Sequence, residues 1–158
     1  PKGPGSDGNP SLYPIGCIGK ISNFEATEDG RNLITLAGIC RFEIVEELTV
    51  ATPYRQVVGA YDNWRCDLDP PMTPDDIRAE LVEALRGYFA VHDISVDWEQ
   101  IERAPLSGLM TSLAMICPFE PSEKQALLEL AAPSEFGRTL VALLKMGTLS
   151  NDDRTVRH

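Results

Sequence analysis

Two apolar runs near the start of the chain alternate with polar residues at a period of two, which is typical of half-buried strands. They are separated by Asp29-Gly30, a dipeptide that favours a tight hairpin turn. In the second run the apolar residues on even positions are Ile34, Leu36, Cys40, Phe42 and Ile44. The pattern predicts a long antiparallel hairpin with one apolar face. Gly38 lies in the same register, and we expect a bend or bulge there.

A third strand is predicted over residues 53–60, where Tyr54, Val58 and Ala60 share one phase. The sequence then loses its periodicity and becomes rich in Pro and Asp, which indicates a linker. Further along, apolar residues recur at helical spacing. Helices are predicted from Ile77 to Phe89, from about Asp97, from Leu106 to Cys117, after Pro121, and from Ser134 to Met146.

Local signals predict where these helices begin and end. Thr73-Pro74 is typical of a helix start, and Asp97-Trp98-Glu99-Gln100 matches a capping box. Ser122 with Gln125 offers an alternative capping box for the next helix, and Gly147 is expected to end the last one. The sequence thus predicts an α+β chain. Its expected parts are a twisted antiparallel β lobe at 1–66, a linker at 67–73, a bundle of four or five helices at 74–147, and a polar tail at 148–158.

Four motifs follow one another along the chain: PIGCIGKI, LITLAGICRFEIVEEL, PYRQ and PFEPSEKQALLE. In this order they resemble the N-terminal domain of the ATP-dependent Lon proteases and of its stand-alone relatives, a domain that is also similar to part of cereblon. The resemblance extends from about Leu12 to Met146. The positions that carry it are Pro14, Gly16, Gly19, Gly38, Arg41, Phe42 and Tyr54 in the β lobe, and Glu123, Lys124 and Gln125 in the helical lobe.

This resemblance implies a small, partly closed, barrel-like β lobe of the PUA-like kind, joined to a helical bundle. It also implies an earlier section of two apolar strands, a Phe-Glu-Pro-Arg-Tyr-like motif and a helix, which this sequence lacks. We therefore expect the chain to be a fragment, with a hairpin edge or face that the missing strands would cover. The polar stretch after Met146 favours a stand-alone relative over a piece of a full Lon protease.

Charge restricts the possible partners. The chain has 24 acidic and 14 basic residues and a net charge of −10. Nucleic acids and anionic membranes are bound largely through Lys and Arg, so this balance disfavours both. No apolar run approaches the roughly 20 residues that span a bilayer, and no signal peptide is visible, so we expect a cytoplasmic protein.

The sequence offers few residues or motifs for catalysis or metal binding. The sequence has no G-x-x-x-x-G-K-[ST] loop, and no counterpart of the Ser-Lys dyad of Lon. Its four cysteines form no C-x-x-C pair and are interpreted as small buried hydrophobes, and with two histidines a metal site is disfavoured. Paired carboxylates lie in turns or at helix starts, where solvation or capping explains them. We expect no catalytic residue, no cofactor and no metal.

The remaining hypothesis is protein binding. The resemblance implies capture of unfolded or degron-bearing polypeptides, or an adaptor role with a dedicated protein partner. A receptor for such ligands needs exposed apolar side chains or an open strand edge. The candidate contact residues are Tyr54, Tyr61, Trp64, Met72, Trp98 and Ile101. Met110 and Met115 are interpreted as core, and Arg41 is expected to pair with Glu43 or Glu25 across the sheet.

Two alternatives stay open. A PUA-like RNA-associated module would need a local basic patch, for which the β lobe offers only Arg31, Arg41 and Arg55. A small-molecule receptor is suggested by analogy with cereblon. That protein's ligand pocket belongs to a separate zinc-bearing domain, whose Cys pairs this chain lacks.

Overall fold

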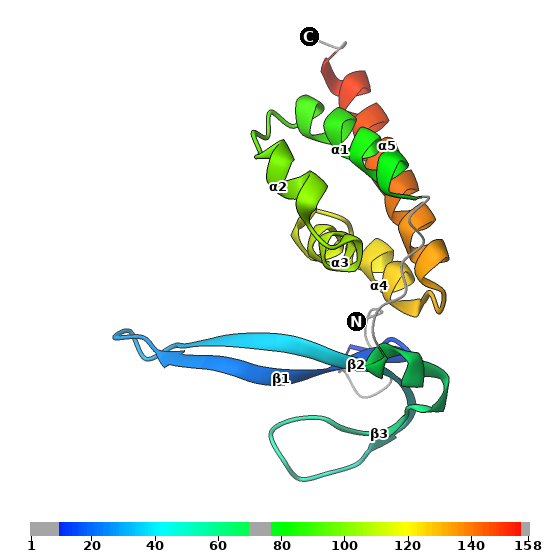
Figure 1. The fold of residues 1–158 in the computed structure, drawn as a ribbon. Coiled ribbons are helices and arrows are strands. Elements are labelled where there is room, and N and C mark those ends of the chain that lie inside the picture. Colours follow the sequence, from blue (N-terminus) through cyan, green and yellow to red (C-terminus); the bar gives the residue numbers. More distant parts are fainter. Residues whose placement is uncertain (1–9, 70–76, 156–158) are drawn as a thin grey trace. The chain divides into compact units, whose positions relative to one another are not determined.

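The computed structural model describes residues 10–69 and 77–155, with side chains described as far as residue 149. The chain divides into two compact units, residues 1–70 and 71–158, which are called the β unit and the helical unit (Figure 1). The predicted α+β class is confirmed, because a three-stranded antiparallel sheet is followed by five α-helices in the described part of the chain.

The β unit consists of one long hairpin and one short strand. Strands β1 (Ile15–Ala26) and β2 (Asn32–Leu48) form the hairpin, and β3 (Gln56–Ala60) pairs with the C-terminal part of β2. The sheet order is β1-β2-β3. A 3-10 helix, η1 (Asp62–Leu68), follows β3. The turn end of the hairpin therefore extends beyond the part of the sheet that β3 covers (Figure 1).

The hairpin turn forms where the sequence predicts it. Gly30 has a φ of 80°, in the left-handed region that glycine adopts without steric cost. Its N–H donates to the Thr27 carbonyl at 3.0 Å, and the Thr27 N–H donates to the Arg31 carbonyl at 2.9 Å. Arg31 Nε also donates to Asp29 Oδ2 at 2.6 Å, so side chains reinforce the turn.

Three bulges interrupt the two ladders. Ser22 on β1 is the extra residue between the pairs Ile21–Leu36 and Asn23–Thr35. Ile39 on β2 is extra between Ile18–Cys40 and Gly19–Gly38, and Val45 is extra between Ile44–Gly59 and Glu46–Val58. The bulge at Ile39 confirms the irregularity expected beside Gly38.

One consequence corrects the predicted strand face. An extra residue reverses the alternation of side chains, because two residues of one strand oppose a single residue of the other. The Ile39 bulge therefore places Ile34 and Leu36 on one face and Cys40, Phe42 and Ile44 on the other. The prediction that all five share a face is wrong.

The helical unit contains α1 (Arg78–Val91), α2 (Trp98–Arg103), α3 (Leu106–Ile116), α4 (Pro121–Glu129) and α5 (Pro133–Thr155). Helices α1 and α5 pack along each other, and α3 and α4 complete the core. The fully buried leucines at its centre are Leu81, Leu85, Leu127, Leu140 and Leu144. Burial of apolar side chains, of which these leucines are the most completely buried, is the main favourable contribution to folding of this unit.

The observed helix starts agree only in part with those predicted from the sequence. The Asp97 side chain accepts from the N–H groups of Glu99 and Gln100, as the predicted cap requires. Helix α4 begins at Pro121 with Glu120 as N-cap, not Ser122, and the Glu123 carboxylate accepts from the Glu120 N–H at 2.8 Å. The predicted start at Thr73-Pro74 lies outside the described residues.

Gly147 does not end the last helix, which continues to Thr155. A Cβ at this position would lie 2.7 Å from Cε2 and 3.2 Å from Cδ2 of Tyr88, a residue that is almost completely buried. The absent side chain lets α5 approach the ring on α1. The glycine is therefore explained by packing between helices and not by a helix stop.

We predict that Gly147→Ala destabilises the helical unit by about 1–3 kcal/mol, because the new methyl group overpacks the Tyr88 contact. Gly108→Ala is the matched control, since nothing lies within 4 Å of its Cβ position in α3. That change should be neutral or stabilise the unit by up to about 1 kcal/mol. Thermal unfolding followed by circular dichroism measures both, and an equal effect of the two changes would contradict the packing explanation.

Candidate functional site

The turn half of the hairpin carries an apolar patch that no other part of the described structure covers. Ladder partners lie on the same face, so the pairs Ile21–Leu36 and Phe24–Ile34 each place two side chains together. Ile34 and Leu36 are two residues apart and share that face. These four residues, Ile21, Phe24, Ile34 and Leu36, are called the hairpin patch. Their exposed fractions are 57%, 59%, 51% and 62%.

The Ser22 bulge assembles this patch. Ile21 and Phe24 are three residues apart and would point to opposite faces of a regular strand. The extra residue brings them to one face, and the Ser22 Oγ donates to the Thr35 carbonyl at 3.1 Å, which stabilises the irregular backbone. Leu33 pairs with Glu25 and lies on the opposite face, although it is as exposed as Phe24.

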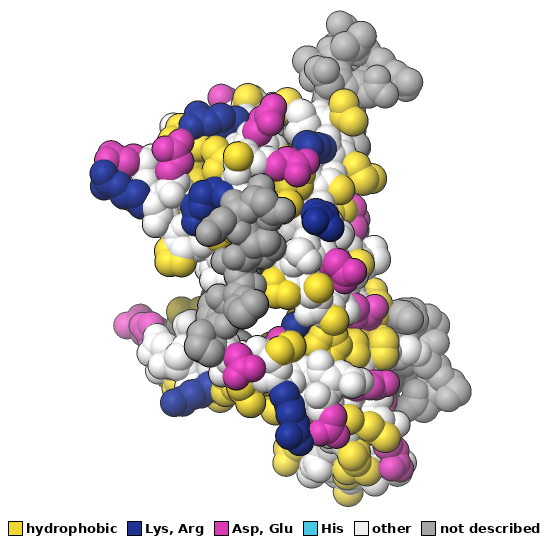
Figure 2. Space-filling view, turned by 45° about the vertical axis from the view of Figure 1, so that its right-hand side comes forward, with side chains coloured by type: hydrophobic (Ala, Val, Ile, Leu, Met, Phe, Trp, Pro, Cys, Tyr) yellow, Lys and Arg dark blue, Asp and Glu magenta, His cyan; other side chains and the backbone are white. Residues whose placement is uncertain are grey.

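An open strand edge borders the patch. In the described residues β1 pairs with β2 alone, so its outer edge presents backbone N–H and C=O groups to solvent. The space-filling view shows hydrophobic side chains exposed over the β unit (Figure 2). A soluble domain rarely exposes a contiguous apolar surface beside an unpaired strand unless that surface binds something.

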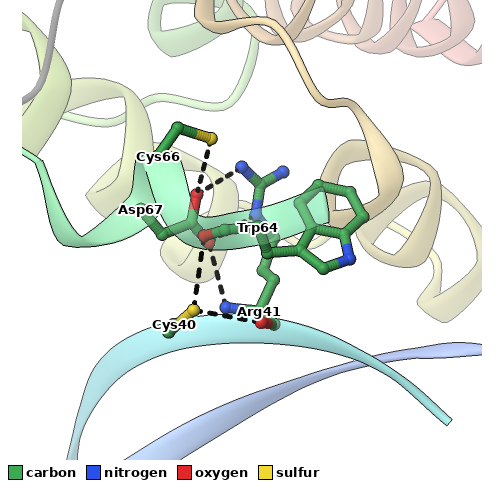
Figure 3. Close-up of polar contacts among 5 residues, drawn as sticks. All are labelled: Cys40, Arg41, Trp64, Cys66 and Asp67. Atoms are coloured by element: carbon green, nitrogen blue, oxygen red, sulfur yellow. Dashed lines mark hydrogen bonds and ion pairs between the residues drawn. The ribbon is translucent and has the colours of Figure 1, made fainter. Parts of the chain in front are cut away.

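Arg41 and Asp67 join the base of the hairpin to η1 (Figure 3). The Asp67 carboxylate accepts from the Arg41 backbone N–H at 2.9 Å, from Nε at 2.8 Å and from Nη2 at 2.6 Å. Both side chains are more than four-fifths buried. Asp67 therefore satisfies an N–H of β2 beyond the end of β3, at a point where no other described strand pairs with β2 on that side.

Trp64 and Cys40 complete this junction. The Arg41 guanidinium lies 4.1 Å from the centroid of the buried Trp64 ring, a cation–π contact. The Cys40 thiol donates to the Trp64 carbonyl at 3.4 Å, and burial raises the pKa of that thiol. Hydrogen bonds from Arg41 lower the pKa of Asp67, and the same bonds raise the pKa of Arg41. Both charges are thus stabilised by their contact.

Phe42 lies on the face of β2 opposite to the Arg41 side chain, the same face as Cys40. A Cβ at Gly16 would lie 2.8 Å from Phe42 Cζ, and one at Gly59 would lie 2.9 Å from Phe42 Cδ2. Glycines on both neighbouring strands therefore leave room for the ring, which also lies 5.8 Å from the ring centroid of Tyr61. Gly19 and Gly38 oppose each other at the Ile39 bulge, where Gly38 accommodates the Cys17 thiol. The three motif glycines Gly16, Gly19 and Gly38, together with Gly59, thus leave space for neighbouring side chains in the hairpin.

The candidate contact residues of the sequence analysis are dispersed. Tyr54 and Tyr61 are exposed near the two ends of β3. Trp64 is buried under Arg41 and offers no surface for a ligand. Trp98 and Ile101 belong to the helical unit, where both are partly buried against its core. Met72 lies outside the described residues.

Two further expectations need correction. Arg41 pairs with Asp67 and not with Glu43 or Glu25, because η1 folds back onto β2. Met110 is in the core as expected, but Met115 is exposed at the end of α3. In the helical motif, the Lys124 Nζ donates to the Met115 carbonyl at 2.9 Å, and Gln125 Nε2 donates to Glu129 Oε1 at 2.8 Å. The Lys124 contact joins α4 to α3, whereas the Gln125 contact lies within α4.

The cysteines also differ from expectation. Cys40 and Cys117 are buried, but Cys17 and Cys66 are exposed, so only two of the four act as small buried hydrophobes. Within residues 10–69 and 77–155, no group of three or more His, Cys, Asp or Glu side chains is arranged to bind a metal ion. No helix among the described residues is long and apolar enough to cross a membrane.

Sequence reasoning did not find Ile21, Phe24 or Leu36 as site residues. In β2, Leu36 alternates with polar residues, and an alternating apolar face is normally the buried side of a strand. The one available signal is the three-residue separation of Ile21 and Phe24 around Ser22, which conflicts with a regular strand. That conflict does not by itself indicate exposure.

Comparisons with known proteins agree with this fold. The model of the ATP-dependent protease La (LON) substrate-binding domain matches residues 2–145. The chain belongs to the Lon substrate-binding domain family. Almost the whole of the given chain therefore consists of this one Lon-type domain.

Two solved structures share the fold of this Lon-type domain. The N-terminal domain of Mycobacterium avium complex Lon protease is 19% identical, with a TM-score of 0.59 over 89% of this chain and 78% of that one. A Lon N-terminal domain protein from Xanthomonas campestris is 16% identical, with a TM-score of 0.54 over 86% of this chain and 70% of that one. Comparison with curated proteins gives no significant match.

We predict that Asp67→Asn destabilises the β unit by about 2 kcal/mol, because it weakens three charge-assisted hydrogen bonds in a largely buried place. The folded-state pKa of Asp67 lies below its unfolded value of about 3.9. Its stabilisation is therefore complete above that value, and is lost as the pH falls through the folded-state pKa. The variant should lack this acid-dependent loss.

Trp64 fluorescence in a Trp98→Phe background reports on the β unit during denaturant titrations between pH 2 and 7. Asp62→Asn is the matched control, since Asp62 forms a highly exposed ion pair with Arg65 on the same η1. It should change stability by less than about 0.5 kcal/mol. Equal effects of the two substitutions would contradict a special role for Asp67.

Proposed function

We propose that this Lon-type domain binds extended apolar segments of unfolded polypeptides at the hairpin patch and the adjoining edge of β1. The observation that carries the proposal is the exposure of four aligned apolar side chains beside an unpaired strand. The family description, a substrate-binding domain of an ATP-dependent protease, supports a polypeptide as the ligand.

The geometry suits a strand-like ligand. A segment that pairs with β1 would satisfy the N–H and C=O groups of its outer edge. Every second side chain of that segment would then lie on the same face as Ile21 and Phe24, where burial of apolar area provides affinity. Backbone pairing is independent of sequence, so the proposed site would accept many polypeptides that expose apolar residues. Folded proteins hide both features and would not compete.

Tyr54 and Tyr61 are proposed as secondary contacts. They are exposed on the β unit, and aromatic side chains with a polar tip suit interfaces that are partly wet. Trp64 is not included, because Arg41 and the core cover it. Trp98 and Ile101 belong to the other unit and are not part of this proposed surface.

The charges of the β unit do not favour the RNA alternative. Each of its four arginines is paired with a carboxylate: Arg31 with Asp29, Arg41 with Asp67, Arg55 with Glu47, and Arg65 with Asp62. Among residues 10–69 this leaves Lys20 as the one basic side chain without an ion pair. A phosphate backbone requires several free cations along its path. The described surface therefore favours a polypeptide ligand.

We predict that the double variant Phe24→Thr, Ile34→Thr binds an unfolded polypeptide at least tenfold more weakly than the parent. Anisotropy of fluorescently labelled, reduced and carboxamidomethylated α-lactalbumin measures the affinity, and the folded protein serves as competitor. Threonine retains strand propensity while removing most of the apolar area. A tenfold loss corresponds to about 1.4 kcal/mol, which is less than the free energy expected from burial of two apolar side chains of this size.

Leu33→Thr is the matched control, because Leu33 is equally exposed on the opposite face of the hairpin. It should leave the affinity within about twofold. Equal losses for both faces would indicate non-specific hydrophobic attraction. Absence of saturable binding at tens of micromolar, the weak end of specific recognition, would contradict the proposed function.

A further inference from the structure

The Ser22 bulge restricts which strands can pair with the outer edge of β1. Before the bulge, Ile21 lies on the face of the hairpin patch and Lys20 on the opposite face. After the bulge, Phe24 lies on the patch face and Glu25 on the opposite face. A partner strand therefore keeps its side chains on matching faces along the whole edge only if it carries a bulge of its own opposite Ser22.

A second copy of this chain provides such a strand without rearrangement. Neighbouring antiparallel strands related by a two-fold axis keep corresponding faces on the same side of the sheet. Among the registers that cross the bulge, one alone matches the faces of all residues from 19 to 26. In that register Ile21 lies opposite Phe24 of the partner subunit, and Ser22 lies opposite Asn23 of the partner subunit.

The charges of β1 are complementary in the same register. Lys20 has no ion pair among residues 10–69, and Glu25 likewise pairs with no described cation. The register places Lys20 directly opposite Glu25 of the partner subunit, and the two-fold symmetry forms this pair twice. Within one chain their ladder partners on β2 are Ala37 and Leu33, so neither residue faces a like charge there.

We propose that two copies of this chain associate through the outer edges of β1, antiparallel about a two-fold axis, and form one six-stranded sheet. Ile21, which is 57% exposed in the single chain, would pack against Phe24 of the partner subunit. Lys20 would pair with Glu25 of the partner subunit on the other face. Both strand edges would then be paired and would no longer offer backbone groups to other chains.

This dimer would use the same strand edge as the polypeptide ligand. β1 has one outer edge, so self-pairing and polypeptide binding exclude each other. The dimer would thus be a latent state that protects the edge when unfolded protein is absent. This regulatory part rests on the proposed function, whereas the self-association does not.

The dimer should be weak. A ladder between two short stretches of strand is a small interface, and the net charge of −10 on each copy opposes association. We therefore expect a Kd on the order of 100 µM. Sedimentation equilibrium in about 0.15 M NaCl, where charges are screened over about 8 Å, measures it.

A charge exchange tests the register. Glu25→Lys should weaken the dimer at least tenfold, because it places two lysines opposite each other at both pairs. It should do so although it makes each copy less negative. The double variant Lys20→Glu, Glu25→Lys reverses both ion pairs at unchanged net charge, and it should return the Kd to within about threefold of the parent value.

Glu46→Lys is the matched control, because it changes the net charge equally at an exposed position of β2, on the strand that pairs with β3. This variant should dimerise at least as well as the parent. A chain that stays monomeric up to about 1 mM would overturn the proposal. Equal weakening by Glu25→Lys and Glu46→Lys, or no recovery in the double variant, would also overturn it.

A second experiment tests the competition for the edge. Saturation with reduced and carboxamidomethylated α-lactalbumin should convert the dimer into a complex that contains one copy of the chain. A dimer that binds the polypeptide and stays intact would overturn the latent-state role. Absence of polypeptide binding would contradict the proposed function and that role together, whereas the dimer itself is decided by the charge exchange.

Discussion

The Arg41–Asp67 contact is the interaction on which the β unit depends. It joins two segments that are 26 residues apart, and it does so through both a backbone N–H and a guanidinium. Strand β3 pairs only with the C-terminal part of β2, so among the described residues no strand pairs with the next portion of β2 on that side. Asp67 supplies the missing acceptor. Trp64 then covers the guanidinium and excludes water from the pair.

This junction leaves the turn half of the hairpin without a covering element in the described residues. The buried face of β2 is restricted to its base, where Phe42 packs between Gly16 and Gly59. Beyond the Ile39 bulge the apolar residues lie on the opposite face and remain exposed. A surface of this kind, next to an unpaired edge, is costly for a soluble protein unless it contributes to binding. The proposed polypeptide site follows from that cost.

Much of the fold could be predicted from the sequence because its signals are local. Asp29-Gly30 specified the turn, Asp97 the start of α2, and the helical periodicity the core of the second unit. Other features depend on contacts between distant segments. From the local sequence Gly147 is predicted to end the helix. In the structure its missing side chain makes room for the Tyr88 ring of α1 against α5. The partner of Arg41 could not be predicted either, because it lies on a segment without periodicity.

The site was harder to predict than the fold. Trp64 was predicted to be a surface residue because polar residues surround it in the sequence. In the structure the Arg41 side chain lies over its ring, which is buried. Strand alternation assigned Ile34 and Leu36 to one apolar face, but alternation does not indicate whether that face is covered. The alternation of side chains between the two faces is also interrupted at a bulge. The extra residues Ser22 and Ile39 therefore determine which side chains share a face of the hairpin. Exposure and register are properties of the folded sheet.

Hydrogen exchange of the chain, alone and saturated with unfolded α-lactalbumin, is the most direct test of the central claim. If the polypeptide pairs with the hairpin, amides of residues 15–26 should exchange more slowly in the complex, and amides of the helical unit should be unchanged. The protection should be greatest around the Ser22 bulge, beside the hairpin patch. Protection confined to the helical unit, or none in β1, would contradict the account.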